Sequence, residues 1–241
     1  MRQLPFPIWD QKGYIPFPAG LAGQRARLRN IKSIAVRCLT ANERGGFMLL
    51  QARFNQIILM EQHKVYEIEK GLAFIWSVRS DGQQSLTDIL HHGMAAEFPD
   101  TPDTIYEFRT QAASRIRVHP LEPASLPPEQ LVHLLTKLRA HSWRSLQLAT
   151  ICRQKYIRER LDMFLSFLNQ QFGVQFKNTQ RLVPFVLTHE HIANAINSTR
   201  STVTRMMNEL EQEGQISHVQ LGKNRLIVFP SAQSSEVGRL V

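Results

Sequence analysis

The sequence predicts an α+β protein in three parts, and three observations on its 241 residues support that prediction. Short stretches rich in Val, Ile, Phe, Leu and Tyr lie between residues 31 and 126, separated by turn signals. The stretch from Glu129 to Phe172 contains no proline or glycine. The remainder contains two short helical patterns followed by a two-strand pattern. We therefore expect a roll of strands, a long helix and a small C-terminal domain.

Composition favours a soluble protein with real cores. Hydrophobic residues make up 43% of the chain and charged residues 20%, which excludes a disordered tail protein. No apolar run approaches the roughly 18 residues of a membrane helix. Residues 1–30 form an unmatched N-terminal tail without the apolar segment of a secretory signal. We expect the protein to be cytoplasmic.

The sequence predicts no metal, no cofactor and no enzymatic activity. Cys38 and Cys152 lie far apart and have no ligand spacing, which is typical of structural thiols. The histidine pairs have no further ligands at suitable spacing, so we interpret them as facing solvent or phosphate. They are His91 with His92, and His189 with His191. No catalytic triad, phosphate-binding glycine loop or pair of buried carboxylates is indicated.

Residues 31–126 predict a β-sandwich or roll. The candidate strands are Gln56–Met60, Val65–Ile68, Leu72–Val78 and Ser114–Val118. The turn signals between strands are at residues 69–71, 80–82, 92–93 and 99–100. Many short strands at this spacing are typical of sandwiches and rolls.

Residues 127–154 predict a long helix that Pro128 is well placed to begin. A second helix follows after a break near Arg153 to Lys155. Leucine and alanine recur at helical spacing along the first helix. These residues either form a seam with a second copy of the chain or pack on the chain's own sheet, and the sequence leaves both alternatives open. They are Leu131, Leu134, Leu135, Leu138, Leu146 and Ala149.

Two helices joined by a short turn are predicted within residues 155–241. Leu187–Ile196 is the first, with Thr188 as its cap and Glu190 near its positive end. Asn197 tolerates the left-handed conformation that the turn needs. The second helix spans Thr199–Glu213 and is ended by Gly214.

The apolar positions of these two helices have the spacing of a helix-turn-helix. The residues expected to lock the helices together are Ile192, Ala193, Ile196, Val203 and Met206. Beyond them, Gln215–Gln220 and Arg225–Phe229 predict a hairpin around Gly222–Asn224. This hairpin would supply a wing.

The exposed face of the second helix suits a DNA major groove, because an Arg near the start of such a helix can bond guanine O6 and N7. The side chains concerned are Thr199, Arg200, Ser201, Thr202, Thr204 and Arg205. The chain carries a net charge of +9, but residues 181–241 contain 6 basic and 5 acidic side chains. The DNA-binding hypothesis therefore rests on the motif rather than on bulk charge.

The stretch Leu187–Phe229 resembles the winged helix-turn-helix of the Crp-Fnr family, and Asn197–Arg205 is most similar to its NtcA-like nitrogen-control branch. Upstream, Val65–Leu90 and Tyr106–Leu121 resemble strands of the family's sensor, so the resemblance spans roughly residues 45–230. It implies a cyclic-nucleotide-binding-like jelly roll, a dimerisation helix and a bacterial homodimer bound to palindromic double-stranded DNA.

The resemblance also implies roles for single residues. Arg200 would contact a base, Arg205 a base or phosphate, and Thr188 and His189 the DNA backbone. Ser201 stands where the cyclic-AMP branch has an acidic residue, so we do not expect that branch's sequence preference. Activators of the family also contact RNA polymerase.

The sensor departs from the family's pattern. Thr104 and Ile105 stand where cyclic-nucleotide binders have an Arg-Ser pair, and Asp100 and Asp103 would repel a phosphate. The 2-oxoglutarate pocket of the nitrogen-control branch does not carry over either. Its helix positions hold Ala140 and Ser145, although Arg139 and Arg144 lie adjacent. The sequence thus predicts a degenerate sensor without cyclic-nucleotide control, and it leaves any effector unknown.

These observations together predict a dimeric, sequence-specific transcriptional regulator. The alternative is a sensor of a small metabolite or a protein partner in which DNA contact is secondary. A third hypothesis is nonspecific coating of nucleic acid by Arg25, Arg27 and Arg29, which predicts that trimming residues 1–30 abolishes binding.

Overall fold

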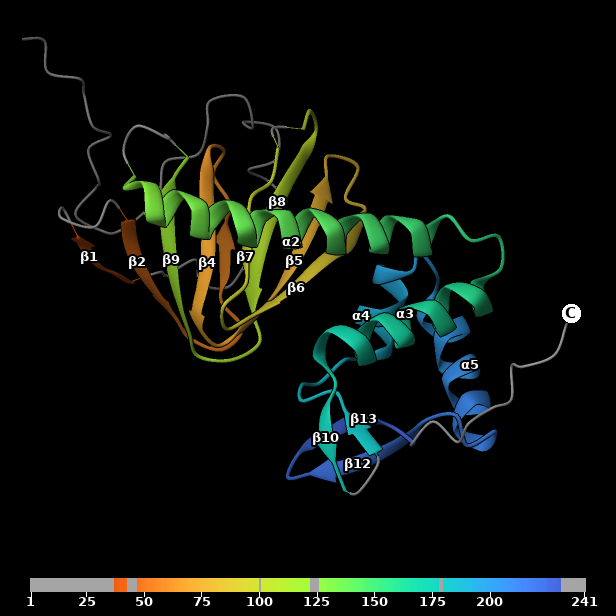
Figure 1. The fold of residues 1–241 in the computed structure, drawn as a ribbon. Coiled ribbons are helices and arrows are strands. Elements are labelled where there is room, and N and C mark those ends of the chain that lie inside the picture. Colours follow the sequence, from red (N-terminus) through yellow and green to blue (C-terminus); the bar gives the residue numbers. More distant parts are fainter. Residues whose placement is uncertain (1–36, 43–46, 100, 122–125, 178–179, 231–241) are drawn as a thin grey trace, which may run out of the picture. The chain divides into compact units, whose positions relative to one another are not determined.

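The computed structural model describes residues 37–42, 47–99, 101–121, 126–177 and 180–230. The predicted tail, with Arg25, Arg27 and Arg29, lies outside these residues, and so do Asp100 and the side chain of Cys38. The chain divides into two units, one ending at Ser145 and the other beginning at Leu146 (Figure 1). The division therefore falls inside the predicted long helix.

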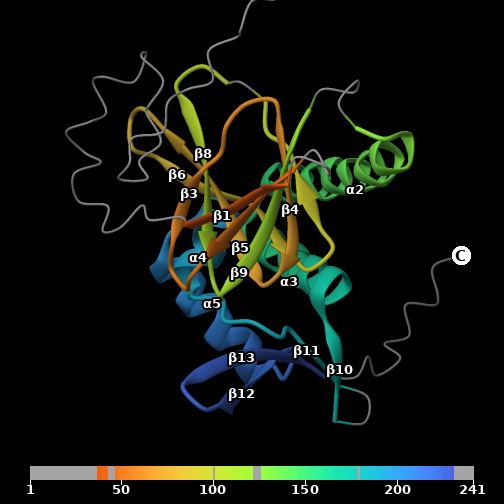
Figure 2. The same cartoon turned by 90° about the vertical axis from the view of Figure 1, so that its left-hand side faces the viewer.

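The described strands of the first unit form two antiparallel sheets, as predicted for a roll (Figures 1 and 2). One sheet has the order β1-β2-β9-β4-β7 and the other β3-β8-β5-β6. The strands are β1 (Arg37–Asn42), β2 (Phe47–Ala52), β3 (Ile57–Leu59), β4 (Lys64–Lys70), β5 (Leu72–Arg79), β6 (Gln84–His91), β7 (Ala95–Ala96), β8 (Thr104–Thr110) and β9 (Ser114–Pro120). All four candidate strands are present, as β3, β4, β5 and β9.

Glycine makes the tight turn from β4 to β5. Gly71 has a φ of 108°, a region that side chains of L-residues rarely adopt. A Cβ placed there would lie 2.7 Å from the Cα of Ser114, so the turn also brings two backbones close together. The predicted turns at 80–82 and 92–93 likewise contain Gly82 and Gly93 with positive φ.

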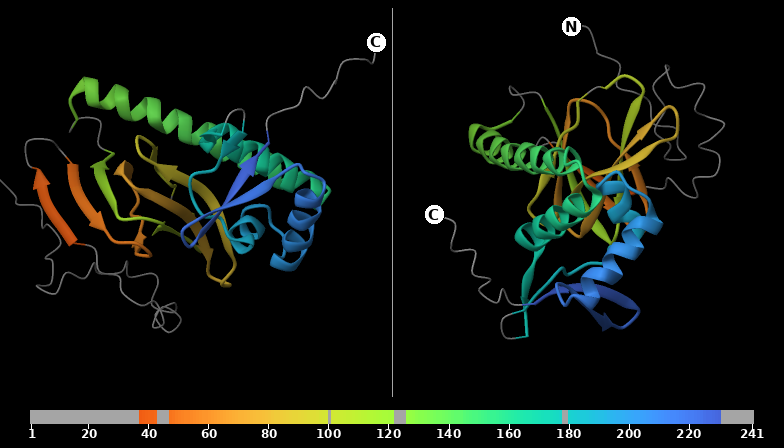
Figure 3. Two further views of the ribbon diagram at one scale, coloured as in Figure 1. Left: turned by 90° about the horizontal axis from the view of Figure 1, so that it is seen from below. Right: turned by 90° about the vertical axis from the view of Figure 1, so that its right-hand side faces the viewer.

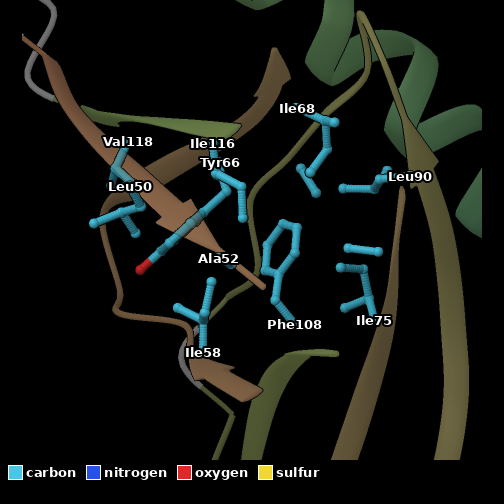
Figure 4. Close-up of a cluster of buried hydrophobic side chains, with 12 residues drawn as sticks. Leu50, Ala52, Ile58, Tyr66, Ile68, Ile75, Leu90, Phe108, Ile116 and Val118 are labelled. Atoms are coloured by element: carbon cyan, nitrogen blue, oxygen red, sulfur yellow. The ribbon is translucent and has the colours of Figure 1, made fainter. Parts of the chain in front are cut away.

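The core of the roll lies between its two sheets and consists of alternate strand residues (Figure 4). Phe108 of β8 and Tyr66 of β4 lie at its centre with ring centroids 5.3 Å apart. The other buried members include Leu50, Ile58, Ile68, Ile75, Leu90, Ile116 and Val118. Burial of these side chains supplies most of the driving force for folding of this unit.

Helix α2 (Pro128–Cys152) follows the roll and packs one face on it (Figure 1). Leu131, Leu134 and Leu138 join Val65 and Ala95 in a second apolar cluster. The remaining three members of the predicted seam, Leu135, Leu146 and Ala149, are exposed. The leucine pattern thus divides between two faces of one helix: one face packs within the chain and the other is exposed.

A buried ion pair links the first half of α2 to the roll. The carboxylate of Glu67 on β4 accepts a hydrogen bond from His119 Nε2 at 3.0 Å and a second bond from the ammonium of Lys137 on α2. The bond from His119 lowers the pKa of Glu67 to about 2, against the opposing effect of burial and with help from Lys137. Glu67 therefore stays ionised throughout the physiological pH range.

Replacing Glu67 with glutamine should lower the free energy of unfolding at pH 7 by about 1–3 kcal/mol, because His119 and Lys137 lose a charged acceptor. The pKa of Glu67 lies below its ordinary value of 4.5, so its contribution is complete above pH 4.5 and is lost as pH falls towards 2. Urea unfolding of both proteins across this range should show the difference shrinking. A difference that does not change with pH would contradict this explanation.

A second buried cluster fastens the later part of α2 to the same unit. Asp88 on β6 is fully buried and accepts hydrogen bonds from His141 Nδ1 at 2.7 Å and Arg144 Nη2 at 3.3 Å. The other ring nitrogen of His141 lies 3.2 Å from the carbonyl oxygen of Glu97. Arg144, one of the two arginines noted for a bound anion, is thus already paired with a carboxylate of the chain itself.

The second unit contains α3 (Ile157–Phe172), α4 (His189–Ala195), α5 (Arg200–Gln212) and the four-stranded sheet β10-β11-β13-β12. Its strands are β10 (Val174–Phe176), β11 (Gln180–Leu182), β12 (Ser217–Leu221) and β13 (Asn224–Phe229). The break between α2 and α3 and the hairpin β12–β13 appear where the sequence predicts them. Strands β10 and β11 are not predicted, because segments of three residues carry almost no periodic signal. None of the described helices is long and apolar enough to cross a membrane.

Candidate nucleic-acid interface

Helix α4 begins with the predicted cap. The Thr188 side-chain oxygen accepts a hydrogen bond from the backbone N–H of His191 at 3.1 Å. In return, His191 Nδ1 accepts a bond from the backbone N–H of Thr188 at 3.4 Å. This reciprocal pair satisfies amides that have no partner inside the helix and fixes where α4 starts.

The turn between α4 and α5 depends on Asn197, which has a φ of 53° as predicted. Arg160 of α3 supports the same turn: its Nη1 lies 3.3 Å from the carbonyl oxygens of both Ile196 and Asn197. Its Nε also donates to the carbonyl oxygen of Gln154 at 2.7 Å. The sequence analysis missed Arg160, because nothing local indicates which distant carbonyl groups an arginine will bind.

The left-handed Asn197 leads to a testable difference between two small substitutions. Asn197→Gly should leave stability unchanged or raise it slightly, whereas Asn197→Ala should lower the free energy of unfolding by about 1 kcal/mol. Thermal or urea unfolding of the two variants measures this difference. Equal stabilities would mean that the positive φ of this turn carries no energetic cost.

Helix α5 lies against α4, as the blue ribbons of Figure 3 show. Val203, Met207 and Leu210 are its buried residues, and Ile192 and Ala193 face them from α4. The prediction of Met206 as a locking residue is wrong in detail, since Met206 is only half-buried and Met207 is 1% exposed. Counting four residues from Val203 instead of three keeps the side chain on the buried face.

The opposite face of α5 carries the predicted polar residues. Thr199 caps the helix, with its hydroxyl oxygen accepting from the backbone N–H of Thr202 at 3.3 Å. Arg200, Ser201 and Arg205 are exposed. Arg205 forms an ion pair with Glu209 at 2.6 Å, whereas Arg200 takes part in none of the ion pairs found among the described residues. Arg200 is therefore the arginine of this face that has no carboxylate partner among the described residues.

Thr202 and Thr204 are half-buried, and their hydroxyl groups are already engaged. Thr204 Oγ1 donates to the carbonyl oxygen of Arg200 at 2.8 Å and lies 2.9 Å from His189 Nδ1. Thr202 Oγ1 lies 2.9 Å from Thr199 Oγ1. Thr204 thus links α4 to the first turn of α5, a role that the sequence analysis did not assign to it.

The hairpin β12–β13 adds charged groups next to the helices. Arg225 Nη2 lies 2.9 Å from Glu211 Oε2, and His218 Nδ1 lies 3.0 Å from Glu211 Oε1. The hydrogen bond from His218 lowers the pKa of Glu211, and Arg225 contributes to the same effect. The sequence analysis missed His218 and Arg225, although their position in a hairpin expected to act as a wing is a signal that could have identified them.

The histidine pairs noted in the sequence are engaged within the chain. The ring nitrogens of His91 and His92 contact backbone oxygens, and those of His189 and His191 contact Thr204 and Thr188. In the part of the chain that the structure describes, no three His, Cys, Asp or Glu side chains are grouped so that they could hold a metal ion.

The match to a known domain covers these helices and the hairpin. Residues 159–232 match the Crp-like helix-turn-helix domain. This Crp-like domain includes nearly all of α3, the whole α4–turn–α5 motif and the wing. No curated protein sequence matches the chain.

Solved structures of CRP/FNR-type regulators share the fold. TTHA1359, a CRP/FNR-family transcriptional regulator from Thermus thermophilus, is 19% identical, with a TM-score of 0.57 over 76% of this chain and 93% of that one. FixK2 from Bradyrhizobium japonicum is 19% identical, with a TM-score of 0.58 over 78% and 94% of the chains. CLP from Xanthomonas campestris, a c-di-GMP-responsive global regulator, is 13% identical, with a TM-score of 0.59 over 77% and 95%. These likenesses confirm the predicted fold class: a cyclic-nucleotide-binding-like roll, a long helix and a winged helix-turn-helix.

Proposed function

We propose that this protein is a sequence-specific DNA-binding transcriptional regulator, and that it acts as a homodimer on palindromic operators in the bacterial cytoplasm. The observation that carries the proposal is the exposed face of α5 in a Crp-like domain, with Arg200 at its first helical position and free of ion pairs among the described residues. This helix is capped, supported from α3 and packed on α4, so its polar face is held rigidly for a major groove.

We assign two kinds of DNA contact to this domain. Arg200 reads a guanine through O6 and N7, and Ser201 and Arg205 contact bases or phosphates beside it. Three residues at the amino ends of the two helices contact the DNA backbone, and these contacts position α5 in the groove. They are Thr188, His189 and Thr199. Thr202 and Thr204 contribute indirectly, because their hydroxyl groups form hydrogen bonds within the chain that stabilise the start of α5. The NtcA-like character of Asn197–Arg205 supports a half-site preference different from that of the cyclic-AMP branch.

The homodimer rests on the exposed face of α2. Val132, Leu135, Trp143 and Leu146 are 52–64% exposed, although three of them are large and all are apolar. Positions 132, 135, 139, 142, 146 and 149 follow the alternating three- and four-residue spacing of a two-helix seam, in which Arg139 and Ser142 are the polar members. A second copy of the same helix is the occupant that this repeat fits, because a two-fold axis places identical positions opposite each other.

We propose that the roll responds to no cyclic nucleotide. Thr104 and Ile105 occupy the start of β8 and offer no guanidinium group to a phosphate. Arg144, the arginine of α2 that is buried against the roll, is held by Asp88 together with His141. Such a cluster supports a roll that is fixed to α2 by its own side chains rather than by a ligand. The proposed regulator is not an enzyme, and RNA polymerase is its expected second partner if it activates transcription.

Selection of bound duplexes from a random DNA pool tests the proposed function. The full chain, with and without cyclic AMP and 2-oxoglutarate, should enrich one palindromic sequence with half-sites about one helical turn apart. Enrichment should be the same with and without cyclic AMP. Recovery of no common sequence would contradict the regulator assignment and favour the alternative, a sensor in which DNA contact is secondary.

A further inference from the structure

His189 is the first residue of α4, and its ring contacts Thr204 of α5. This contact determines which ring nitrogen is available to a ligand. Thr204 Oγ1 uses its hydrogen in the bond to the Arg200 carbonyl oxygen, so it can only accept from His189 Nδ1, 2.9 Å away. The Nδ1 atom must therefore carry a hydrogen. The ring nitrogen that Thr204 does not occupy, Nε2, is then an acceptor when the ring is neutral and a donor when it is protonated.

The groups that act on this imidazole come from three elements. They are Arg200 and the carboxylate of Glu211 on α5, the imidazole of His218 on β12 and Arg225 on β13. Partial burial lowers the pKa of His189, His218 and the two arginines lower it further, and Glu211 raises it. In the free protein at neutral pH the ring is therefore uncharged.

The two arginines that help to keep the ring neutral, Arg200 and Arg225, also attract an anion. Glu211 already accepts bonds from His218 and Arg225, whereas Arg200 has no such partner among the described residues. A phosphate placed against Nε2 would cancel the repulsion from the positive groups and would gain a charge-assisted hydrogen bond if the ring took up a proton.

We propose that His189 contacts a DNA phosphate through Nε2 and takes up a proton as it does so, which makes DNA binding by this protein stronger at lower pH. This inference rests on the proposed function, because the phosphate is that of the operator duplex bound by α5. It adds a proton-linked step to that function. The regulator would bind the same operator more tightly in a more acidic cytoplasm.

His189→Asn is the variant that separates proton uptake from the other contributions of this side chain to binding. Its side-chain amide retains a donor near the position of Nδ1, so the link to Thr204 can persist, but the amide does not titrate. His63→Asn is the matched control, since it removes an exposed imidazole of the first unit at a left-handed position that asparagine tolerates. Dissociation constants for the duplex recovered by selection are measured from pH 7.5 to pH 6.0. Proton uptake is measured by calorimetry in two buffers of different ionisation enthalpy.

We expect the wild-type dissociation constant to fall about tenfold or more over this range, because a dimer that takes up one proton at each of its two His189 rings changes affinity at most about a hundredfold per pH unit. His189→Asn should lose most of this change and most of the proton uptake, and His63→Asn should keep both. Three results would each overturn the proposal: a wild type whose affinity does not depend on pH, an undiminished change in His189→Asn, or a loss of the change in His63→Asn.

A spectroscopic measurement covers the case in which His189→Asn binds too weakly to compare. The pKa of the His189 ring in the wild-type protein is followed by NMR alone, with the selected duplex and with inorganic phosphate. A rise in the pKa only with the duplex supports the proposal, whereas no rise, or an equal rise with inorganic phosphate, overturns it. Failure of the selection to yield any duplex is a different result, because it counts against the proposed function itself.

Discussion

Arg200→Ala should weaken binding to the selected duplex by about 1–3 kcal/mol and relax the preference at one base pair of each half-site. The guanidinium group is the one donor on the exposed face of α5 that can form two parallel bonds with a guanine edge without first leaving an ion pair among the described residues. Fluorescence anisotropy with the selected duplex and with each single-base variant measures both effects.

Arg79→Ala is the matched control for this measurement. Arg79 ends β5 of the roll and is exposed, so its removal changes the net charge equally without touching α5. It should leave the base preference unchanged and affect affinity little. A loss in Arg200→Ala that is the same for every duplex sequence would assign this residue to a phosphate rather than to a base.

The double variant Leu135→Asp, Leu146→Asp should convert the protein from a dimer to a monomer. Each substitution places a carboxylate opposite its own copy across the proposed two-fold axis, where it would be buried without a partner. Binding to the palindrome should then fall by about 100-fold or more, because a monomer loses the gain from holding two half-sites at once. Light scattering gives the mass, and anisotropy gives the affinity.

Phe54→Asp is the control for that variant. Phe54 is 67% exposed in the first unit and lies outside α2, so the same type of substitution should change neither mass nor affinity. Thermal unfolding of the double variant should show a folded protein, since Leu135 and Leu146 contribute little to the core. A folded double variant that remains a dimer would contradict the assignment of the seam to α2.

Local sequence signals predict helices α4 and α5 well. Thr188, Asn197 and Gly214 mark the ends of the two helices by their own chemistry: a hydroxyl cap, a left-handed turn and a glycine stop. These properties depend on a few neighbouring residues, so they can be recognised without any knowledge of the fold. The glycine turns of the roll were predictable for the same reason.

Pairings across long stretches of sequence could not be predicted. Glu67 with Lys137, and Asp88 with His141, join residues more than fifty positions apart. The hydrogen bond of Thr204 to the Arg200 carbonyl oxygen could not be predicted either, because its formation depends on the packing of α4 against α5. The leucines of α2 show the same limit: their spacing predicts an apolar helix but not which leucines meet the roll.

The base contact of Arg200 can be tested most directly by a double-mutant cycle with the selected duplex. The guanine assigned to Arg200 is replaced by 7-deazaguanine, which lacks the N7 acceptor, and both duplexes are bound by the wild type and by Arg200→Ala. We predict that the modified base weakens wild-type binding but barely affects the variant, with a coupling energy of about 1 kcal/mol or more. The contrary result is that the losses of binding free energy from the modified base and from Arg200→Ala simply add. If they add at this guanine and at every other guanine of the half-site, Arg200 does not read a base.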